Sequence, residues 1–274
     1  MDRREFLTAV AAGAASACAR APMQGTRRLD LIGVQLYTVR SEMAKGVEAT
    51  LERVAAIGYR EVEFAGYFDR SPEEIRAALA ATGLSAPAAH VPFERIESGW
   101  STTLDEAARA GHDTVLVAGI PEDRRRTLDE GRACAALFNQ AGEAAKNAGL
   151  RYAYHNHDFE FPRIDGQVPY EVLLAETDPA LVAFELDLFW VINGGGDPLA
   201  YFASNPGRFQ LVHVKDRDAT GRMVDVGAGR IDFAGIFARA EQAGIRHYFV
   251  EHDEPADPFA SIEASYRYLR RLEF

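Results

Sequence analysis

The sequence has little cysteine, little excess basic charge and no long apolar segment. Its 274 residues include 2 cysteines, and 41 acidic residues outnumber 30 basic ones, so the formal net charge is −11 at pH 7. An acidic chain without long basic runs is poorly suited to binding the phosphate backbone of a nucleic acid. No segment approaches the roughly 20 uninterrupted apolar residues of a membrane-spanning helix. We therefore expect no nucleic-acid partner and no membrane span.

The N-terminus has the pattern of an export signal. The residues RREFL at positions 3–7 precede a weakly apolar, alanine-rich run over 8–19. This arrangement resembles a twin-arginine signal, so we expect a periplasmic protein in which residues 1–28 form the signal and a flexible N-terminus. An ordinary amphipathic helix is one alternative, and a lipoprotein modified at Cys18 is another.

The second cysteine, Cys134, lies in an alanine-rich helical pattern. If residues 1–21 are removed on export, Cys134 is the only cysteine left, so no internal disulfide can form even in an oxidising compartment. We expect it to be a small core residue.

After the N-terminal segment, short β-type runs alternate with helical patterns. Eight strands are predicted at residues 31–37, 61–64, 84–90, 114–118, 150–157, 182–188, 209–214 and 247–251. Eight helices are predicted at residues 47–57, 71–82, 103–110, 129–148, 170–176, 198–204, 233–243 and 258–269, with no strand–strand hairpin between these elements. Strict alternation indicates parallel strands, and eight units in about 245 residues is the size of a (β/α)8 barrel. An open doubly wound sheet is the alternative, but no G-x-G-x-x-G follows the first strand. We predict an α/β protein whose residues 29–274 form one (β/α)8 TIM barrel.

Several predicted strands end in side chains that suit metal or sugar binding. In an extended strand alternate residues share a face, so His155 and His157 point the same way. One such residue alone is more often a satisfied polar group of the core, but four successive strands that end in possible ligands favour a site at the carboxyl ends of the barrel strands. The candidates are Glu63, His90, His155, His157, Glu185, Asp187, His213, Lys215 and Glu251. A mixed carboxylate–imidazole set fits one divalent metal ion of intermediate hardness, such as Mn²⁺, Co²⁺, Zn²⁺ or Fe²⁺.

The sequence resembles the xylose isomerase-like TIM barrels, usually described as sugar phosphate isomerases/epimerases, over residues 31–270. The resemblance is carried by the segments AYHNHDFEF, HVKD with VGAGRIDF, and FVEHDE. Members of this family typically hold one divalent metal ion between a Glu, an Asp, a His and a Glu that end strands five to eight. The last three positions match Asp187, His213 and Glu251. At strand five His155 stands in place of the Glu, and His157 is the alternative ligand.

The resemblance implies a metal-dependent isomerase or epimerase that abstracts an α-proton from a sugar or keto-sugar through a metal-stabilised enediolate. Glu251 or His157 is the expected base, and Lys215 the donor to the developing oxyanion. Contacts to the carbohydrate substrate are expected from Glu63, His90, Asn156, Glu185 and Trp190. Because His155 replaces a glutamate of the epimerase pair, a lyase or dehydratase, such as one that eliminates from a 3-keto-glycoside, is the alternative.

Simpler explanations and other classes of protein stay open. Glu185 is as suited to pairing with a buried cation as to catalysis, and Lys215 with Asp216 is as suited to an internal ion pair. A non-catalytic sugar-binding barrel would keep the fold without the chemistry. A nuclease of the endonuclease IV type shares the barrel, but the acidic charge opposes it. A homo-oligomer is compatible with the sequence.

Overall fold

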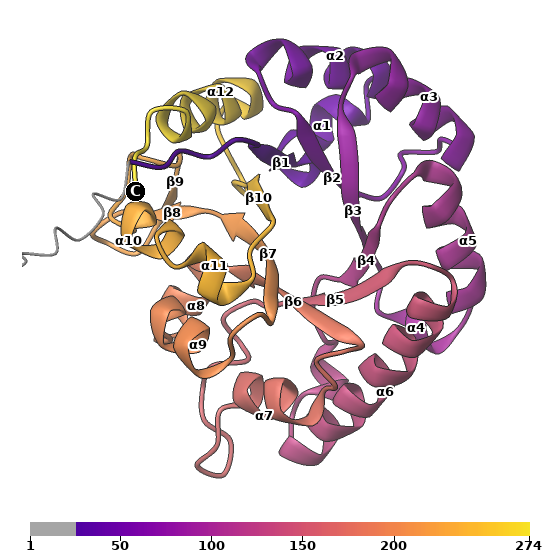
Figure 1. Ribbon diagram of the computed structural model, residues 1–274, viewed down its shortest axis with the longest axis vertical. Helices are drawn as coiled ribbons and strands as arrows, with labels where there is room; N and C mark the ends of the chain where they lie inside the picture. The colour runs from indigo at the N-terminus through magenta and orange to yellow at the C-terminus, as the bar shows by residue number, and fades with distance from the viewer. Residues whose placement is uncertain (1–25) are drawn as a thin grey trace, which may run out of the picture.

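The computed structural model describes residues 26–274, so nearly all of the predicted export signal lies outside the described residues. The sheet is a closed barrel of parallel strands in the order β1-β10-β7-β6-β5-β4-β3-β2, with the helices around it (Figure 1). The barrel strands are β1 (Gly33–Gln35), β2 (Glu61–Ala65), β3 (Ser85–Val91), β4 (Thr114–Val117), β5 (Arg151–His155), β6 (Val182–Asp187), β7 (Phe209–Val214) and β10 (His247–Val250). The predicted (β/α)8 barrel is confirmed, and the open sheet is wrong.

The helices follow the strands in chain order. They are η1 (Leu36–Val39), α1 (Arg40–Met43), α2 (Val47–Ile57), α3 (Pro72–Thr82), α4 (Glu94–Glu97), α5 (Trp100–Ala110), η2 (Glu122–Arg124), α6 (Leu128–Asn147), α7 (Pro169–Glu176), α8 (Leu188–Asn193), α9 (Pro198–Ser204), α10 (Phe233–Phe237), α11 (Ala240–Ala243) and α12 (Pro258–Leu269). Sequence signals place their starts well: Ser71 forms a capping box with Glu74, and Asp197 and Asp257 cap the helices that follow them. Within the described residues, none of these helices is both long enough and apolar enough to span a membrane.

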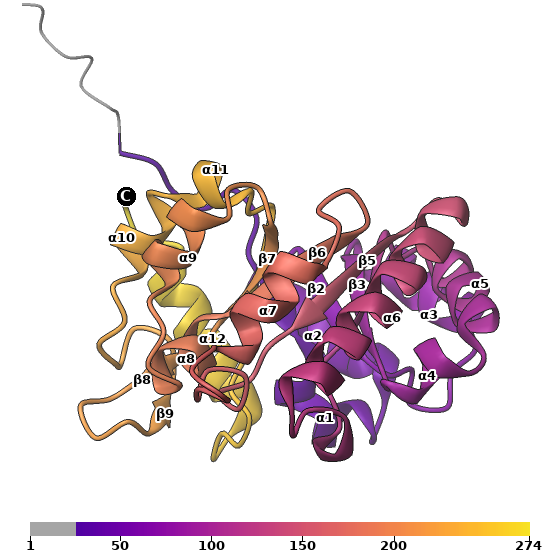
Figure 2. The same ribbon diagram turned by 90° about the horizontal axis from the view of Figure 1, so that it is seen from below.

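Two expectations about the segment after β7 were wrong. A two-stranded antiparallel hairpin, β8 (Asp216–Arg217) with β9 (Met223–Val224), follows β7, although no hairpin was predicted. Figure 2 shows it on the same end of the barrel as α1. The helix predicted over residues 233–243 is divided into α10 and α11, because Arg239, with φ −103° and ψ 10°, leaves the helical conformation.

The hairpin loop is held by a buried carboxylate. Asp216 accepts hydrogen bonds from four backbone N–H groups, those of Arg217 (2.8 Å), Gly227 (2.9 Å), Gly229 (2.9 Å) and Ile231 (3.1 Å). Gly229 has no room for a side chain, because a Cβ there would lie 2.3 Å from Oδ1 of Asp216. The HVKD and VGAGRID motifs therefore form one folded unit, and the alternative of a Lys215–Asp216 ion pair is not what the structure shows.

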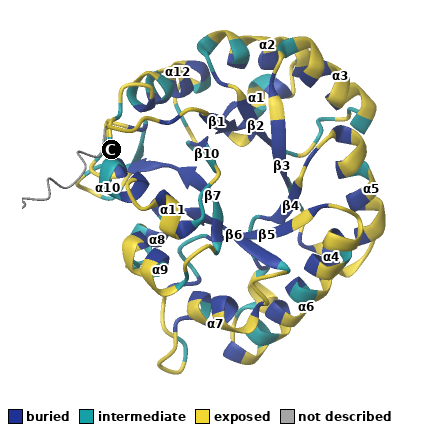
Figure 3. Cartoon of the chain, in the orientation of Figure 1, coloured by how far each residue is buried: buried dark blue, intermediate teal, exposed yellow. Residues whose placement is uncertain are grey.

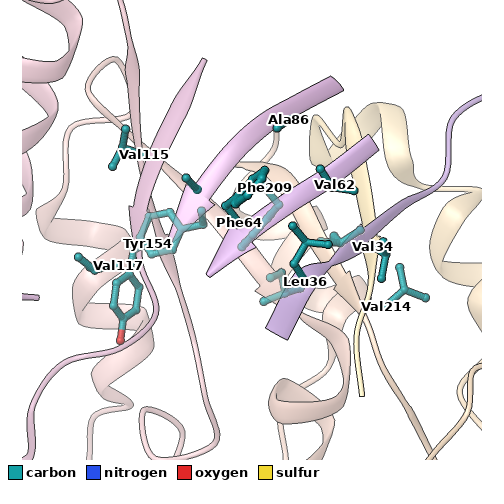
Figure 4. Packing of buried hydrophobic residues seen from close by; sticks show 14 of the residues in the cluster. Val34, Leu36, Val62, Phe64, Ala86, Val115, Val117, Tyr154, Phe209 and Val214 are labelled. Carbon is teal, nitrogen blue, oxygen red and sulfur yellow. The ribbon is translucent and has the colours of Figure 1, made fainter. Parts of the chain in front are cut away.

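The main hydrophobic core lies between the strands and the helices that surround them. Figure 3 shows the buried residues concentrated on the strands and on the inward faces of the helices. Val34, Val62, Phe64 and Val214 are fully or almost fully buried in this layer (Figure 4). Cys134 is buried in the same core on α6, as expected of a small apolar residue. The barrel wall is therefore supported from outside, which leaves its interior free for polar side chains.

An apolar layer closes the barrel below the site. It consists of Ala88, Leu116, Ala153, Ala183, Leu211 and Phe249, which are buried inside the barrel. Phe249 is the bulkiest member, and a Cβ on Gly33 of the adjacent strand would lie 2.5 Å from its ring. Because side chains alternate along a strand, the residues two positions further along each strand form the next layer up, towards the carboxyl ends. That next layer is polar.

Candidate active site

The polar layer and the residues just above it hold the side chains that the sequence predicts for a site. The polar layer contains Gln35, Glu63, His155, Glu185 and His213, all buried, with His90 more open to solvent. Above it a cavity of about 330 Å³ opens at the carboxyl ends of the strands. The cavity is lined by Tyr37, Ala65, His90, Ala118, His155, His157, Lys215, Glu251, Asp253 and Glu254. The alternation of each strand thus brings residues from six strands to one place.

Glu185 lies at the centre of three imidazoles. Its Oε2 is 3.0 Å from Nε2 of His90, 3.1 Å from Nδ1 of His155 and 3.1 Å from Nε2 of His213. The strand register explains one of these contacts, since His155 and Glu185 are direct neighbours on β5 and β6. A carboxylate that accepts hydrogen bonds from several rings fixes the orientation of each.

Glu63 completes this inner network from β2. Its Oε2 accepts a hydrogen bond from Nε2 of Gln35 at 2.7 Å and lies 2.7 Å from Nε2 of His213 and 3.1 Å from Nε2 of His90. His213 is therefore held through Nε2 by two carboxylates, which leaves Nδ1 directed away from the inner layer. Nδ1 of His213 lies 2.7 Å from Oε2 of Glu251.

A second group of possible ligand atoms is formed by Asp187, His213 and Glu251, and of these residues Glu251 lines the cavity. Oδ2 of Asp187 is 3.7 Å from Nε2 of His155 and also 3.7 Å from Nδ1 of His213. Asp187 itself is fixed, because its Oδ1 accepts the backbone N–H of Trp190 at 2.9 Å and caps α8. Each of the two histidines thus has one ring nitrogen on Glu185 and the other towards the carboxylates at the mouth. This is the arrangement that orients histidine ligands for a metal ion.

Lys215 is the cation that neutralises this outer group. Its Nζ lies 3.1 Å from Oδ2 of Asp187, 2.7 Å from Oε2 of Glu251 and 2.8 Å from Oδ1 of Asp253. The side chain is 2% exposed, so its charge is compensated by carboxylates and not by water. Burial opposes the charged form, but Asp187 and Glu251 outweigh it and raise the pKa of Lys215 above its usual value.

The charges of the network set the pKa values of its members. Burial would raise the pKa of Glu251, but the charges of Lys215 and His213 hold it well below the usual range. Burial and the nearby charge of His213 lower the pKa of His155 to about 3, so its imidazole is neutral. Burial would also lower the pKa of His90, but Glu63 and Glu185 raise it to about 9. The site therefore combines ionised carboxylates with a neutral imidazole on β5.

The donor set fits a divalent metal ion. Two overlapping groups have ligand atoms within 4.8 Å of one another: Asp187, His213 and Glu251, and His90, His155, Glu185 and His213. Buried carboxylate oxygens without a hydrogen-bond partner in the described structure remain on Glu63 (Oε1) and Glu185 (Oε1), whereas Oδ2 of Asp187 has the ammonium of Lys215 at 3.1 Å. Unpaired buried anionic oxygens are costly, and a cation satisfies them. Nitrogen and oxygen donors together suit Mn²⁺, Fe²⁺, Co²⁺ or Zn²⁺.

His157 lines the cavity but does not belong to either ligand group. Its ring lies between Phe159, stacked at a centroid distance of 5.4 Å, and Trp190 at 5.7 Å. Its Nδ1 is buried without a hydrogen-bond partner in the described structure. Burial lowers the pKa of His157 to about 4, which keeps the imidazole neutral. The strand predicted over residues 150–157 ends at His155, so His157 lies beyond β5. Both histidines line the cavity, but only His155 belongs to a group of possible metal ligands in the described chain.

Four of the residues expected to contact substrate do not line the cavity: Glu63, Asn156, Glu185 and Trp190. Glu63 and Glu185 lie in the layer below and orient imidazoles. Asn156 is fully buried, and its Oδ1 accepts the backbone N–H of Asp187 at 3.1 Å, so it links β5 to β6. Of the expected substrate contacts, His90 does line the cavity.

Sequence reasoning assigned no site role to several residues of the cavity wall. Ala65 and Ala118 are small and leave space, while Glu254 adds a carboxylate at the rim. The acidic run EHDEPAD after the last strand was a usable signal for Glu254. Small residues such as Ala65 give no such signal, since alanine is common throughout this chain.

Comparison with known proteins agrees with this fold. Residues 51–272 match the model of the family described as xylose isomerase-like TIM barrel. A solved sugar phosphate isomerase/epimerase from Parabacteroides distasonis ATCC 8503 has 27% identity and a TM-score of 0.78, covering 91% of this chain and 96% of that one. The IolI protein with a bound zinc atom shares the fold, with a TM-score of 0.69 and 14% identity over 86% of this chain and 95% of that one. An inosose dehydratase of Lacticaseibacillus casei is 22% identical, covering 83% of this chain and 91% of its own length.

Proposed function

We propose that this chain, which belongs to the xylose isomerase-like TIM barrel family, is a divalent-metal-dependent enzyme that removes the proton α to the carbonyl of a sugar or keto-polyol. The observation that supports this most strongly is the pair of histidines, His155 and His213, each held on one ring nitrogen by Glu185 and directed with the other towards Asp187. Asp187, His213 and Glu251 have ligand atoms within 4.8 Å of one another, and His155 adds an imidazole nitrogen 3.7 Å from Asp187. A metal ion bound there supplies Lewis acidity at the substrate carbonyl.

The residues around the cavity then have distinct tasks. Glu251 and His157 both line it, and either is placed to accept the α-proton. As the proton leaves carbon, the electron pair of the C–H bond moves towards the carbonyl oxygen, where the positive charge of Lys215 at the cavity wall stabilises the developing negative charge. The stacked contact of His157 with Phe159 and its tilted contact with Trp190 limit rotation of its ring. These roles are common to isomerisation, epimerisation and elimination.

The outcome depends on where a proton is delivered next. Return of the proton to the neighbouring carbon gives an isomer, and return to the opposite face of the same carbon gives an epimer. Delivery to a β-hydroxyl breaks the C–O bond and releases water, so the product is a dehydrated ketone. The three outcomes need no oxidant or reductant.

Dehydration is a second candidate that one observation favours. His155 lies at the strand-five position where the resemblance to the family implies a glutamate, and its Nδ1 is 3.1 Å from Oε2 of Glu185. Epimerisation by two glutamates on opposite faces therefore lacks one of its bases. The inosose dehydratase relative acts by loss of water, as its name states, and this supports the same outcome for the present chain.

Solvent exchange tests the shared first step independently of the outcome. Purified protein reconstituted with Mn²⁺, Fe²⁺, Co²⁺ or Zn²⁺ is incubated in D₂O with D-fructose, D-ribulose and an inosose, and NMR follows the α-proton. We expect metal-dependent exchange with at least one of them, and the NMR spectrum separates isomer, epimer and dehydrated product. Asp187→Asn should abolish exchange, whereas Asp129→Asn, with a side chain 92% exposed, should not change it. Failure of the folded protein to retain a divalent metal would leave a sugar-binding barrel as the better explanation.

A further inference from the structure

We infer that the substrate carries no phosphate group, and that the cavity is built for an uncharged polyhydroxy ketone. The inference rests on the proposed function for the reaction and on the charges around the cavity. In (β/α)8 barrels that bind phosphate, the group commonly lies at the loops after strands seven and eight and at the N-terminus of a short extra helix. In this chain each of these places already holds a carboxylate of the protein.

The positive charges of the cavity wall are already neutralised. Within the described part of the chain, Lys215 is the only lysine or arginine that lines this cavity. Its Nζ is within 3.1 Å of three carboxylates, as described above. His90 is directed at Glu63 and Glu185, at 3.1 Å and 3.0 Å. A phosphate dianion would have to displace these partners to reach either cation, which sets its charge against the carboxylates themselves.

The loop after β7 has the backbone geometry of an anion-binding site, but the anion in that site is the carboxylate of Asp216. The four N–H groups that converge on Asp216 are the kind of donor that otherwise holds a phosphate oxygen. Asp216 is 1% exposed, so a ligand has no access to those donors. The N-terminus of α10, the short helix that follows this loop, is likewise occupied, because Asp232 accepts the N–H of Gly235 at 3.0 Å.

The loop after β10 adds negative charge where a phosphate would need positive charge. Asp253 and Glu254 both line the cavity, next to Glu251. Carboxylates accept hydrogen bonds from sugar hydroxyls but repel phosphate and carboxylate groups. The rim therefore favours a neutral polyol over any anionic sugar derivative.

Arg40 and Arg95 each lie next to a residue of the cavity wall. Arg40 at the rim donates through one nitrogen to the carbonyls of Tyr37 (2.8 Å) and Asp253 (2.7 Å), and its guanidinium lies 4.0 Å from the ring centre of Tyr37. Arg95 lines a separate cavity of about 160 Å³ that shares His90 with the active site. The guanidinium of Arg40 already donates to backbone carbonyls. Arg95 is therefore the arginine that a phosphate bound near His90 would contact, contrary to this inference.

Titration calorimetry with inorganic phosphate tests the inference without turnover. We use metal-free protein, because phosphate can bind a metal ion directly. Saturable binding should be absent up to about 10 mM phosphate, as expected for a dianion facing three rim carboxylates. Binding with a Kd below about 1 mM that is lost in Lys215→Met or Arg95→Ala would overturn the inference. This result is independent of whether the protein catalyses proton exchange.

A variant that is expected to gain phosphate binding provides a second test. The double variant Asp253→Asn with Glu254→Lys should bind inorganic phosphate at least about tenfold more tightly than the wild type, because it removes two negative charges and adds one positive charge at the rim. Glu241→Lys on α11 is the control, since it introduces a lysine away from the cavity. Equal affinity of the double variant and the control would show that the rim carboxylates do not set the charge preference.

Turnover adds a third comparison. In the D₂O assay with metal-loaded protein, exchange with D-fructose and D-ribulose is compared with exchange with D-fructose 6-phosphate and D-ribulose 5-phosphate. We expect kcat/KM to favour the free sugar of each pair by about 100-fold or more. Preference for the phosphate esters would refute the inference while leaving the proposed chemistry intact. Absence of exchange with every sugar would count against the proposed function, and calorimetry would still decide the question of charge.

Discussion

The ammonium of Lys215 lies 2.7 Å from Oε2 of Glu251, the same oxygen that is 2.7 Å from Nδ1 of His213. One carboxylate oxygen thus faces both the internal cation of the site and a histidine placed to bind a metal ion. The lysine and the metal share the carboxylates Asp187 and Glu251, so their positive charges oppose each other. Several measurable effects depend on this competition.

Lys215→Met should raise the affinity of the site for a divalent metal ion and lower the rate of proton exchange. Removal of a positive charge about 3 Å from two carboxylates leaves more negative potential for the metal, which we expect to tighten binding about tenfold. The exchange rate should fall about 100-fold, because the positive charge beside the developing oxyanion is lost. Competition with a chromogenic chelator measures the first effect, and NMR in D₂O the second. Lys45→Met removes an exposed lysine paired with Glu42 and should change neither.

Glu185→Gln should weaken metal binding although Glu185 does not line the cavity. The amide keeps the volume of the side chain but removes the charge that holds His155 and His213 in position. Loss of such an orienting carboxylate typically lowers metal affinity about 10- to 100-fold. The same chelator competition measures the change, with Glu176→Gln at an exposed position of α7 as the control. Unchanged affinity would show that the two imidazoles are oriented by other contacts.

The buried carboxyl of Glu160 should make stability depend on pH. Burial raises its pKa to about 8, although the hydroxyl of Tyr154 and the N–H of His157 donate to it. The folded protein therefore holds a proton that the unfolded chain releases near pH 4.5, so the free energy of unfolding falls as pH rises from about 4.5 to about 8. The contribution of this group approaches about 1.4 kcal/mol per pH unit within that window.

Glu160→Gln should flatten this part of the pH profile, because glutamine does not titrate. Urea unfolding of both proteins at pH 5, 6, 7 and 8 gives the two slopes. Parallel slopes for the variant and the wild type would assign the pH dependence to other groups.

Two glycines of α6 should respond in opposite directions to alanine. At Gly142 an added Cβ would lie 2.4 Å from the carbonyl oxygen of Leu181, so we expect Gly142→Ala to cost about 2–3 kcal/mol of unfolding free energy. At Gly131 an added Cβ has no neighbour within 4 Å. Gly131→Ala should therefore stabilise the protein by about 0.5–1 kcal/mol through helix propensity. Denaturant unfolding of the two variants checks the contrast, and a loss of stability in both would contradict it.

The alternation of strands and helices was readable because parallel strands buried on both faces give short apolar runs with glycine-terminated helices between them. The strand-end pattern was readable for a related reason, since residues two apart share a face and place His155 beside Glu185 and Asp187 beside His213. The first pair lies in the regular register of β5 with β6, whereas the second depends on the irregularity between Phe184 and Glu185 in the register of β6 with β7.

The alternation of side chains along a strand does not predict which ring nitrogen contacts which carboxylate. The registers of β2 with β3 and of β6 with β7 each contain an irregularity, and no local pattern marks it. These shifts help to set the depth at which Glu63 and Glu185 lie against His213. The β8–β9 hairpin was missed because its strands are two residues each and carry no periodic signal. Asp216 was missed as the loop anchor because its partners are backbone N–H groups, which have no signature in side-chain composition.

The contact between His155 and Glu185 also restricts how this site can change by single amino-acid steps. His155→Glu alone, which would restore the residue expected at that position in the family, would place two buried carboxylates side by side on β5 and β6, where like charges repel. Replacement of Glu185 alone would also be unfavourable, because the imidazoles of His155 and His213 would lose the carboxylate that orients them. Residues 155 and 185 are therefore expected to be exchanged as a pair when such barrels diverge, and that joint exchange would separate one branch of the family from another more reliably than either position alone.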